Sequence, residues 1–111
     1  MTTARITRAT RTDLVEIVKL LGAQLREHDI PATEIGMERA VRGMLEDPRR
    51  GALFLAWDGA AAVGLACLSY TWTLELGGLS SWLDELYVEP GLRGAGVGRA
   101  LLHTAIAERT R

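Results

Sequence analysis

The 111-residue sequence is poor in residues that would mark several common classes of protein. Its single cysteine, Cys67, excludes an intramolecular disulfide and a zinc site built from cysteines. Its single lysine, Lys19, leaves one candidate for Schiff-base chemistry. No stretch approaches eighteen apolar residues, and the first residues contain no apolar segment typical of a signal peptide. The sequence therefore predicts a cytoplasmic protein that is neither exported nor embedded in a membrane.

The charge and size of the chain exclude further classes of partner and ligand. Thirteen basic and fourteen acidic residues give a net charge of -1, without a block of one sign, so we expect no nucleic-acid partner. The two histidines lack the spacing of metal ligands, so we expect no metal. The hydrophobic content of 48% is typical of one globular domain, here residues 1–111. A core this small leaves a groove rather than a large enclosed cavity for a ligand.

Hydrophobic periodicity predicts seven elements in the order β-α-α-β-β-β-α, an α+β (α/β mixed-sheet) class. Thr10 and Asp13 have the spacing of a helix N-cap, and Asp58-Gly59 has the composition of a tight hairpin turn. Four residues, Leu14, Val18, Leu21 and Leu25, are predicted to form the buried stripe of the first helix. The predicted strands are 4–9, 53–57, 62–70 and 82–88, and the predicted helices are 11–27, 34–47 and 96–109.

The segment between the last strand and the last helix is rich in glycine. Backbone N–H groups at a helix N-terminus bind phosphates, and glycines allow a phosphate to approach closely. Arg93 precedes these glycines and could add positive charge. A Walker A loop would require Lys and Ser or Thr after Gly98, where the sequence has Arg99 and Ala100. A dinucleotide fingerprint also fails on spacing, and we expect no second strand of a βαβ unit after the last helix.

The remaining pattern, Arg93-x-x-Gly96-x-Gly98 after Leu86-Tyr87-Val88-x-Pro90, resembles the acetyl-CoA-binding motif of the GNAT superfamily of N-acetyltransferases. The resemblance implies a GNAT-like acyl-CoA N-acyltransferase fold, of which the chain holds the N-terminal portion. It also implies that turn amides bind the CoA pyrophosphate and that the last strand pairs with the pantetheine arm. The implied acetyl-CoA-binding residues are Leu86, Tyr87, Val88, Arg93, Gly94, Ala95, Gly96, Val97, Gly98 and Arg99.

Two carboxylates, Asp84 and Glu85, interrupt the otherwise apolar last strand and are the catalytic candidates. An alkylammonium must lose a proton before it attacks a thioester, and a carboxylate can accept that proton directly or through water. Strand periodicity predicts that the two side chains face opposite sides of the sheet. The segment looks similar to the polyamine-acetylating branch of the family, and this resemblance places the base at Asp84, nine residues before Arg93. A structural or substrate-orienting role for Asp84 remains an alternative.

Other polar and aromatic residues have weaker signals. Glu27, His28 and Asp29 are interpreted either as part of the acceptor side or as a solvated helix end. Tyr87 is predicted to pack in the core, Cys67 to be a buried strand residue and His103 to be exposed. Three aromatic residues flank a predicted loop over 73–81, where they either wall the acceptor groove or pack in the core: Tyr70, Trp72 and Trp82.

The resemblance therefore implies an acetyl-CoA-dependent N-acetyltransferase, and we expect it to act on the primary amine of a small molecule. An oxyanion would be stabilised by a backbone N–H of residues 86–88. Family members ordinarily continue beyond the motif helix with further strands and a helix, which carry the usual acid. The alternative is a truncated or non-catalytic acyl-CoA-binding module. In that case a homodimer or another partner chain would complete the sheet at its open edge.

Overall fold

The described part of the chain forms one sheet of four strands, in the order in which they occur in the sequence. The computed structural model describes residues 4–109. Each strand pairs antiparallel with its neighbour in sequence, so the order is β1-β2-β3-β4, and no strand pair within residues 4–109 is parallel. The predicted α+β class and element order are confirmed. The elements are β1 (Arg5–Arg8), α1 (Leu14–Glu27), α2 (Glu34–Glu46), β2 (Gly51–Asp58), β3 (Ala61–Thr73), β4 (Gly78–Val88) and α3 (Val97–Arg109), with 3-10 helices at Arg11–Asp13 and Pro90–Leu92.

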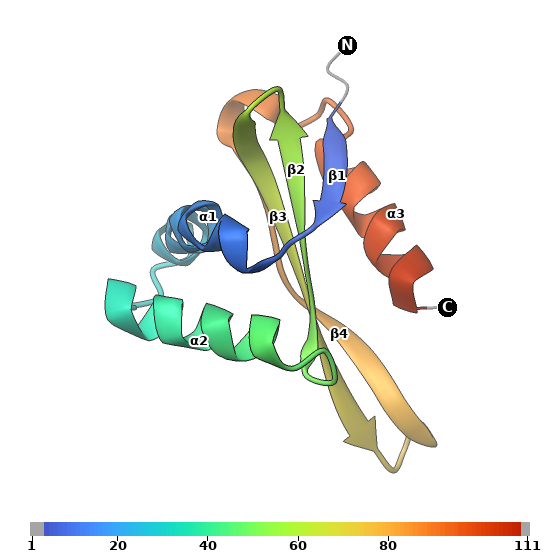
Figure 1. The fold of residues 1–111 in the computed structure, drawn as a ribbon. Coiled ribbons are helices and arrows are strands. Elements are labelled where there is room, and N and C mark those ends of the chain that lie inside the picture. Colours follow the sequence, from blue (N-terminus) through green and yellow to red (C-terminus); the bar gives the residue numbers. More distant parts are fainter. Residues whose placement is uncertain (1–3, 110–111) are drawn as a thin grey trace.

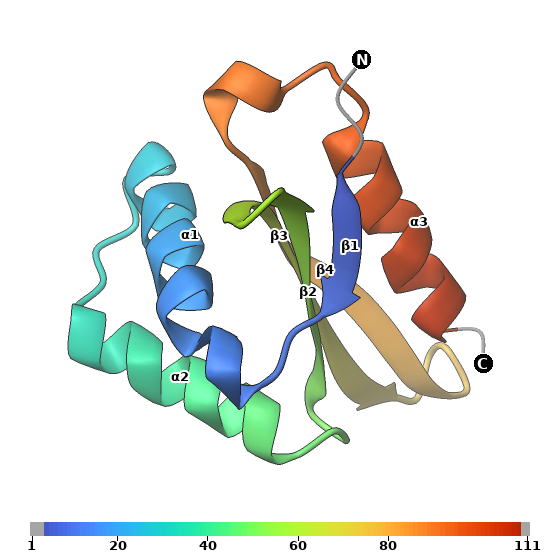
Figure 2. The same cartoon turned by 45° about the horizontal axis from the view of Figure 1, so that its top comes forward.

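Helices cover both faces of this sheet. In Figures 1 and 2, α1 and α2 lie on one face and α3 lies on the other. Successive side chains of β2 divide between the two faces, as expected for a strand. Leu53 and Leu55 pack in the cluster beneath α1 and α2, whereas Phe54 and Ala56 pack in the cluster that contains residues of α3. The sheet therefore separates two thin apolar layers.

The most deeply buried residues of α1 differ from the predicted stripe. Ile17 and Leu20 are at most 1% exposed, whereas the four residues of the predicted stripe are only half-buried. The physical reason is that α1 contacts two neighbours, the sheet and α2. Its apolar surface is consequently wider than one stripe, and the predicted residues lie along the flank of that surface.

The β3–β4 hairpin is longer than the sequence predicts. Gly78 pairs with Thr73, and the ladder continues from there through Trp82. The predicted loop over 73–81 is therefore wrong, because only residues 74–77 connect the two strands. The hairpin extends beyond the three helices (Figure 1), so the alternating apolar residues of its outer part, which include Trp72, Leu74 and Leu76, face solvent rather than a core. Its large exposed apolar residues are Trp72, Leu74, Leu76, Leu79, Trp82 and Leu83.

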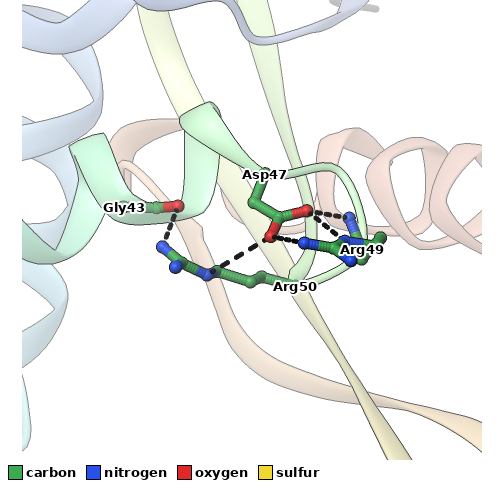
Figure 3. A network of polar contacts seen from close by, with 4 residues as sticks. All are labelled: Gly43, Asp47, Arg49 and Arg50. Atoms are coloured by element: carbon green, nitrogen blue, oxygen red, sulfur yellow. Dashed lines mark hydrogen bonds and ion pairs between the residues drawn. The ribbon is translucent and has the colours of Figure 1, made fainter.

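A compact polar network holds the connection between α2 and β2 (Figure 3). The Asp47 carboxylate accepts hydrogen bonds from Arg49 Nε at 3.0 Å, Nη2 at 2.9 Å and the Arg49 backbone N–H at 3.0 Å. Arg50 Nη1 donates to the Gly43 carbonyl oxygen at 2.8 Å. The hydrogen bonds from the Arg49 side chain are the main cause that lowers the pKa of Asp47 from 3.8 to about 2. This network ends α2 where Pro48 follows Asp47, as the sequence predicts.

The lowered pKa of Asp47 makes this connection sensitive to acid. A carboxyl group with a lower pKa in the folded state stabilises the fold above its unfolded pKa, and this stabilisation is lost as the pH falls through the folded pKa, here about 2. We expect Asp47→Asn to lower the Tm at neutral pH and to flatten the decline of Tm between about pH 5 and pH 2. Thermal unfolding followed by circular dichroism across this range measures both effects.

A double-mutant cycle provides the control for this prediction. Arg49→Met removes the main donor to Asp47, so the double variant is expected to be little less stable than either single variant. Fully additive losses in Tm would contradict the pairing of these two side chains.

Candidate functional site

The glycine-rich turn leads from the end of β4 into α3. Gly94 and Gly96 have φ angles of +87° and +90°, in a region that residues with a Cβ rarely adopt. A Cβ added at either position would meet no atom within 4 Å. These two glycines are therefore required by the backbone conformation, and the space in front of the turn remains open.

A hollow of about 580 Å³ lies in front of this turn. The first hydrogen bond of α3 runs from the Ala100 N–H to the Gly96 carbonyl oxygen, at 3.0 Å. The N–H groups of Gly96, Val97 and Gly98 precede that bond and donate to no acceptor among residues 4–109. Free donors and the positive end of the helix dipole suit the hollow to a phosphate group. Its lining residues are Val88, Arg93, Gly94, Ala95, Gly96, Gly98 and Arg99.

Arg93 is held by three neighbours at the edge of this hollow. Its Nε donates to the Val88 carbonyl oxygen at 2.8 Å, and its Nη2 donates to Glu27 Oε2 at 2.6 Å. Its guanidinium lies 5.4 Å from the centre of the Tyr87 ring. The hydrogen bond from Arg93 lowers the pKa of Glu27, and the same bond raises the pKa of Arg93. Glu27 therefore partly neutralises the positive charge of Arg93. Arg99 also lines the hollow and forms no ion pair with any described residue.

The end of β4 presents backbone groups at the open edge of the sheet. The Glu89 N–H donates to the Val63 carbonyl oxygen at 2.9 Å, and Leu65 pairs with Tyr87. In an antiparallel edge strand, every second residue hydrogen-bonds to the neighbouring strand, and the residues between them direct their N–H and C=O groups away from it. Because Glu89 and Tyr87 face β3, the N–H and C=O groups of Leu86 and Val88 point outward. The hydrogen bond from Arg93 to the Val88 carbonyl oxygen agrees with this assignment. The sequence predicts the N–H of residue 86, 87 or 88 as the oxyanion donor. The N–H of Tyr87 is directed toward β3, which leaves those of Leu86 and Val88 available.

A β-bulge changes the direction of the two candidate carboxylates. Cys67 pairs with Glu85 and Leu68 pairs with Leu83, so Asp84 is an extra residue in β4. Strand periodicity predicts Asp84 and Glu85 on opposite faces, but both line one cavity on the side of the sheet covered by α1 and α2. That prediction is wrong because the extra residue interrupts the two-residue period.

This cavity has a volume of about 170 Å³ and a mostly apolar wall. Asp84 is exposed and Glu85 is half-buried, whereas residues such as Leu53 and Leu65 are almost fully buried. The carboxylates therefore lie toward solvent and the apolar wall lies deeper. The complete lining consists of Ile17, Leu21, Ala40, Val41, Met44, Leu53, Leu65, Cys67, Asp84 and Glu85.

Two further residues define the character of the cavity wall. Gln24, which is only 9% exposed, donates from Nε2 to Glu85 Oε1 at 3.3 Å. The sequence gives no sign of this contact, because a polar residue in an amphipathic helix is ordinarily placed toward solvent. Burial, with smaller contributions from Asp84 and Glu85, raises the pKa of the Cys67 thiol to about 12. Cys67 is therefore neutral and contributes apolar surface rather than a nucleophile.

Several other candidate residues lie away from this cavity. Glu27 pairs with Arg93, and Glu27, His28 and Asp29 are exposed at the end of α1 without lining the cavity. Trp72 and Trp82 are 72% and 52% exposed on the hairpin, so neither walls the cavity.

Three of the remaining predictions concern burial. Tyr87 packs in the core as predicted, Tyr70 packs against the α3-side cluster, and His103 is exposed as predicted. Within the described part of the chain, no three His, Cys, Asp or Glu residues are grouped closely enough to hold a metal ion. None of the helices described is long and apolar enough to cross a bilayer.

Comparison with known proteins identifies a family. The profile of the acetyltransferase (GNAT) family matches residues 15–109, which is most of the chain and includes β4, the glycine-rich turn and the cavity. No curated protein is significantly similar to the chain in sequence.

Solved structures share the fold. The chain is similar to an integron cassette protein from the mobile metagenome of Cole Harbour Salt Marsh, with a TM-score of 0.87, 28% identity and coverage of 93% of this chain and 68% of that one. A predicted acetyltransferase from Clostridium acetobutylicum, crystallised with acetyl-CoA, gives a TM-score of 0.83, 16% identity and coverage of 97% and 74%. An aminoglycoside 6'-N-acetyltransferase from Acinetobacter haemolyticus gives 0.79, 19% identity and coverage of 93% and 69%.

The backbone of the turn can be tested independently of any ligand. Gly96→Ala places a Cβ on a residue with a φ of +90° and is expected to lower the free energy of unfolding by about 1–2 kcal/mol. Gly98→Ala is the matched control, because its Cβ would lie 3.6 Å from Val88 Cγ2, an ordinary contact within a helix. We expect this control to be neutral or stabilising by up to about 1 kcal/mol. Urea unfolding measures both, and equal losses would contradict the strained-turn interpretation.

Proposed function

We propose, on the premise that this chain belongs to the acetyltransferase (GNAT) family, that it transfers the acetyl group of acetyl-CoA to the primary amine of a small molecule. The observation that carries the proposal is the arrangement along β4. Asp84 and Glu85 line an acceptor-sized cavity, the edge of Leu86 and Val88 follows directly, and the phosphate-suited turn comes next in the chain. A nucleophile site, a thioester site and a pyrophosphate site would thus lie in sequence along one strand and its turn.

In this proposal, acetyl-CoA is bound mainly by backbone groups of β4 and of the glycine-rich turn. The free N–H groups of Gly96, Val97 and Gly98 would donate to the pyrophosphate, and Arg99 would add positive charge. The outward N–H and C=O groups of β4 would pair with the amides of the pantetheine arm. Arg93 would act mainly by fixing the end of β4 against α1 through Glu27, because its guanidinium is already hydrogen-bonded there.

The proposed reaction is direct attack of the amine nitrogen on the thioester carbonyl. An alkylammonium has a pKa near 10, so it must first give a proton to Asp84, directly or through water. The C–N bond then forms, and an outward N–H of Leu86 or Val88 stabilises the carbonyl oxygen as it gains negative charge. The C–S bond breaks and CoA leaves as a thiolate, a tolerable leaving group because its pKa lies near 8.5. The nitrogen gives up its second proton to the departing thiolate or to solvent, so the products are a neutral amide and free CoA.

Acetyl-CoA binding tests the cofactor side. Gly96→Glu would place a carboxylate where the pyrophosphate is proposed to bind, and we expect the affinity for acetyl-CoA to fall at least tenfold, about 1.4 kcal/mol. Gly77→Glu is a matched control, because Gly77 also has a positive φ, +80°, and an open Cβ position, but lies at the hairpin turn. Calorimetric titration of both variants measures the difference. Unchanged affinity in Gly96→Glu would show that the turn is not the pyrophosphate site.

Substitution of the two carboxylates tests the chemistry. Asp84→Asn is expected to lower kcat by about 10²–10⁴-fold, with partial recovery at high pH as more of the amine is deprotonated in solution. Glu85→Gln is expected mainly to raise KM for the amine, because Gln24 already holds Glu85 against α1. Glu75→Gln, on the exposed hairpin turn, serves as the control. A normal kcat in Asp84→Asn with a large loss in Glu85→Gln would transfer the role of base to Glu85.

A non-catalytic acyl-CoA-binding module is the second candidate function. The observation that favours it is the outer edge of β4, which is not paired with any strand among residues 4–109. The exposed apolar residues of the hairpin lie next to this edge. Such an edge is a template for a strand from a partner, here a second copy of the chain. Acetyl-CoA binding without acetyl transfer to any amine would favour this candidate. A dimer that dissociates on dilution, measured by light scattering, would identify the partner as a second copy.

A further inference from the structure

The lining of the cavity between the sheet and the α1–α2 pair indicates the size and polarity of the acceptor molecule, in addition to its amine group. It has an apolar wall from four elements, α1, α2, β2 and β3, and only β4 supplies charge to it. None of its described lining residues is Lys, Arg or His. A ligand that fills this space therefore meets negative charge at one end and hydrocarbon at the other.

We propose that the acceptor is a monoamine with a compact apolar body, which inserts into this cavity while its amine group remains beside Asp84 and Glu85. This inference rests on the proposed acetyltransferase function and specifies its substrate class. It separates such amines from polyamines, aminoglycosides and free amino acids, which all carry further charged or polar groups.

The volume of the cavity sets the size of that body. A cavity of about 170 Å³ is close to the ~150 Å³ apolar cavity that is known to hold benzene in another protein. The acceptor body would accordingly contain about six non-hydrogen atoms. A branched alkyl chain, a linear chain of five or six carbons or a phenyl ring is of this size, whereas an aminoglycoside is several times larger.

The depth of each residue sets the orientation. Leu21, Met44 and Cys67 are half-buried and form the accessible apolar wall, whereas Asp84 is exposed at the solvent side. Ile17, Val41 and Leu65, at most 4% exposed, lie behind this wall. An ammonium group placed at the solvent side meets the carboxylates and keeps part of its hydration. A second ammonium group at the far end of the molecule would enter the deep apolar part without a partner, which is strongly unfavourable.

The same argument applies to a carboxylate on the acceptor. A free amino acid carries its carboxylate one carbon from the amine, which would bring it against Asp84 and Glu85. Like charges at this distance repel, and no described lining residue can neutralise the added charge. Gln24 offers no remedy, because its amide is neutral and the residue does not line the cavity.

Matched acceptor pairs test the proposal with the full chain and acetyl-CoA. Hexylamine and 1,5-diaminopentane have the same number of non-hydrogen atoms and differ by a terminal methyl or ammonium group. 3-Methylbutylamine and leucine share a side chain and differ by a carboxylate. We expect kcat/KM, measured by thiol release, to be at least tenfold higher for the monoamine of each pair. Equal or faster acetylation of the diamine or the amino acid would overturn the proposal while leaving the acetyltransferase function intact.

A variant and a binding measurement complete the test. Ala40, on an exposed part of α2, lines the cavity, so Ala40→Leu would narrow it without altering the deep core, and we expect a fivefold or larger rise in KM for hexylamine. Ala107→Leu, on an exposed position of α3, is the matched control. If no amine is acetylated, the proposed function fails, and calorimetry with hexylamine then decides the inference. Saturable binding weakened by Ala40→Leu supports the cavity assignment, and absence of binding overturns it.

Discussion

The pairing of β3 with β4 is the constraint on which the rest of this structure depends. Because β4 lies at the edge of the described sheet, β3 is its only partner strand there and sets its register. That register directs the backbone groups of Leu86 and Val88 outward and buries Tyr87 beneath α1. The extra residue at Asp84 interrupts the alternation of side chains between the two faces of β4. Residues before and after it therefore follow different alternation patterns. The placement of the carboxylate pair thus follows from the bulge, and the open edge follows from the position of β4 at the end of the described sheet.

The two halves of the candidate site use different parts of the chain. The turn in front of α3 presents mainly backbone N–H groups, which suit a group with many acceptor oxygens. The cavity beneath α1 and α2 presents side chains, with carboxylates toward solvent and hydrocarbon behind them. Arg93 and Glu27 connect these halves, since their ion pair joins the start of the turn to the end of α1.

This division explains how much the sequence could predict. The turn requires Gly94 and Gly96 for its backbone angles, so its geometry is visible as a motif, and the order of the elements follows from periodicity and hairpin glycines. The direction of Asp84 depends on a bulge, which has no residue signature, and the contact between Gln24 and Glu85 joins residues 61 positions apart. The sequence does not predict the outer part of the hairpin, because Gly77-Gly78 is typical of a break between strands, whereas here only residues 74–77 form the turn.

The projecting hairpin also determines the optical properties of the chain. Trp72 and Trp82 are mostly exposed there, whereas Trp57 is half-buried and donates its indole N–H to Thr7 Oγ1 at 2.8 Å. Trp72 aligns with Leu79 and Trp82 aligns with Ser69 in the ladder, which places the two indoles on opposite faces of the hairpin. Two of the three tryptophans thus emit from a largely aqueous environment, one on each face of the hairpin. Tryptophan emission of the intact protein is consequently a built-in reporter of whether either face of the hairpin is covered.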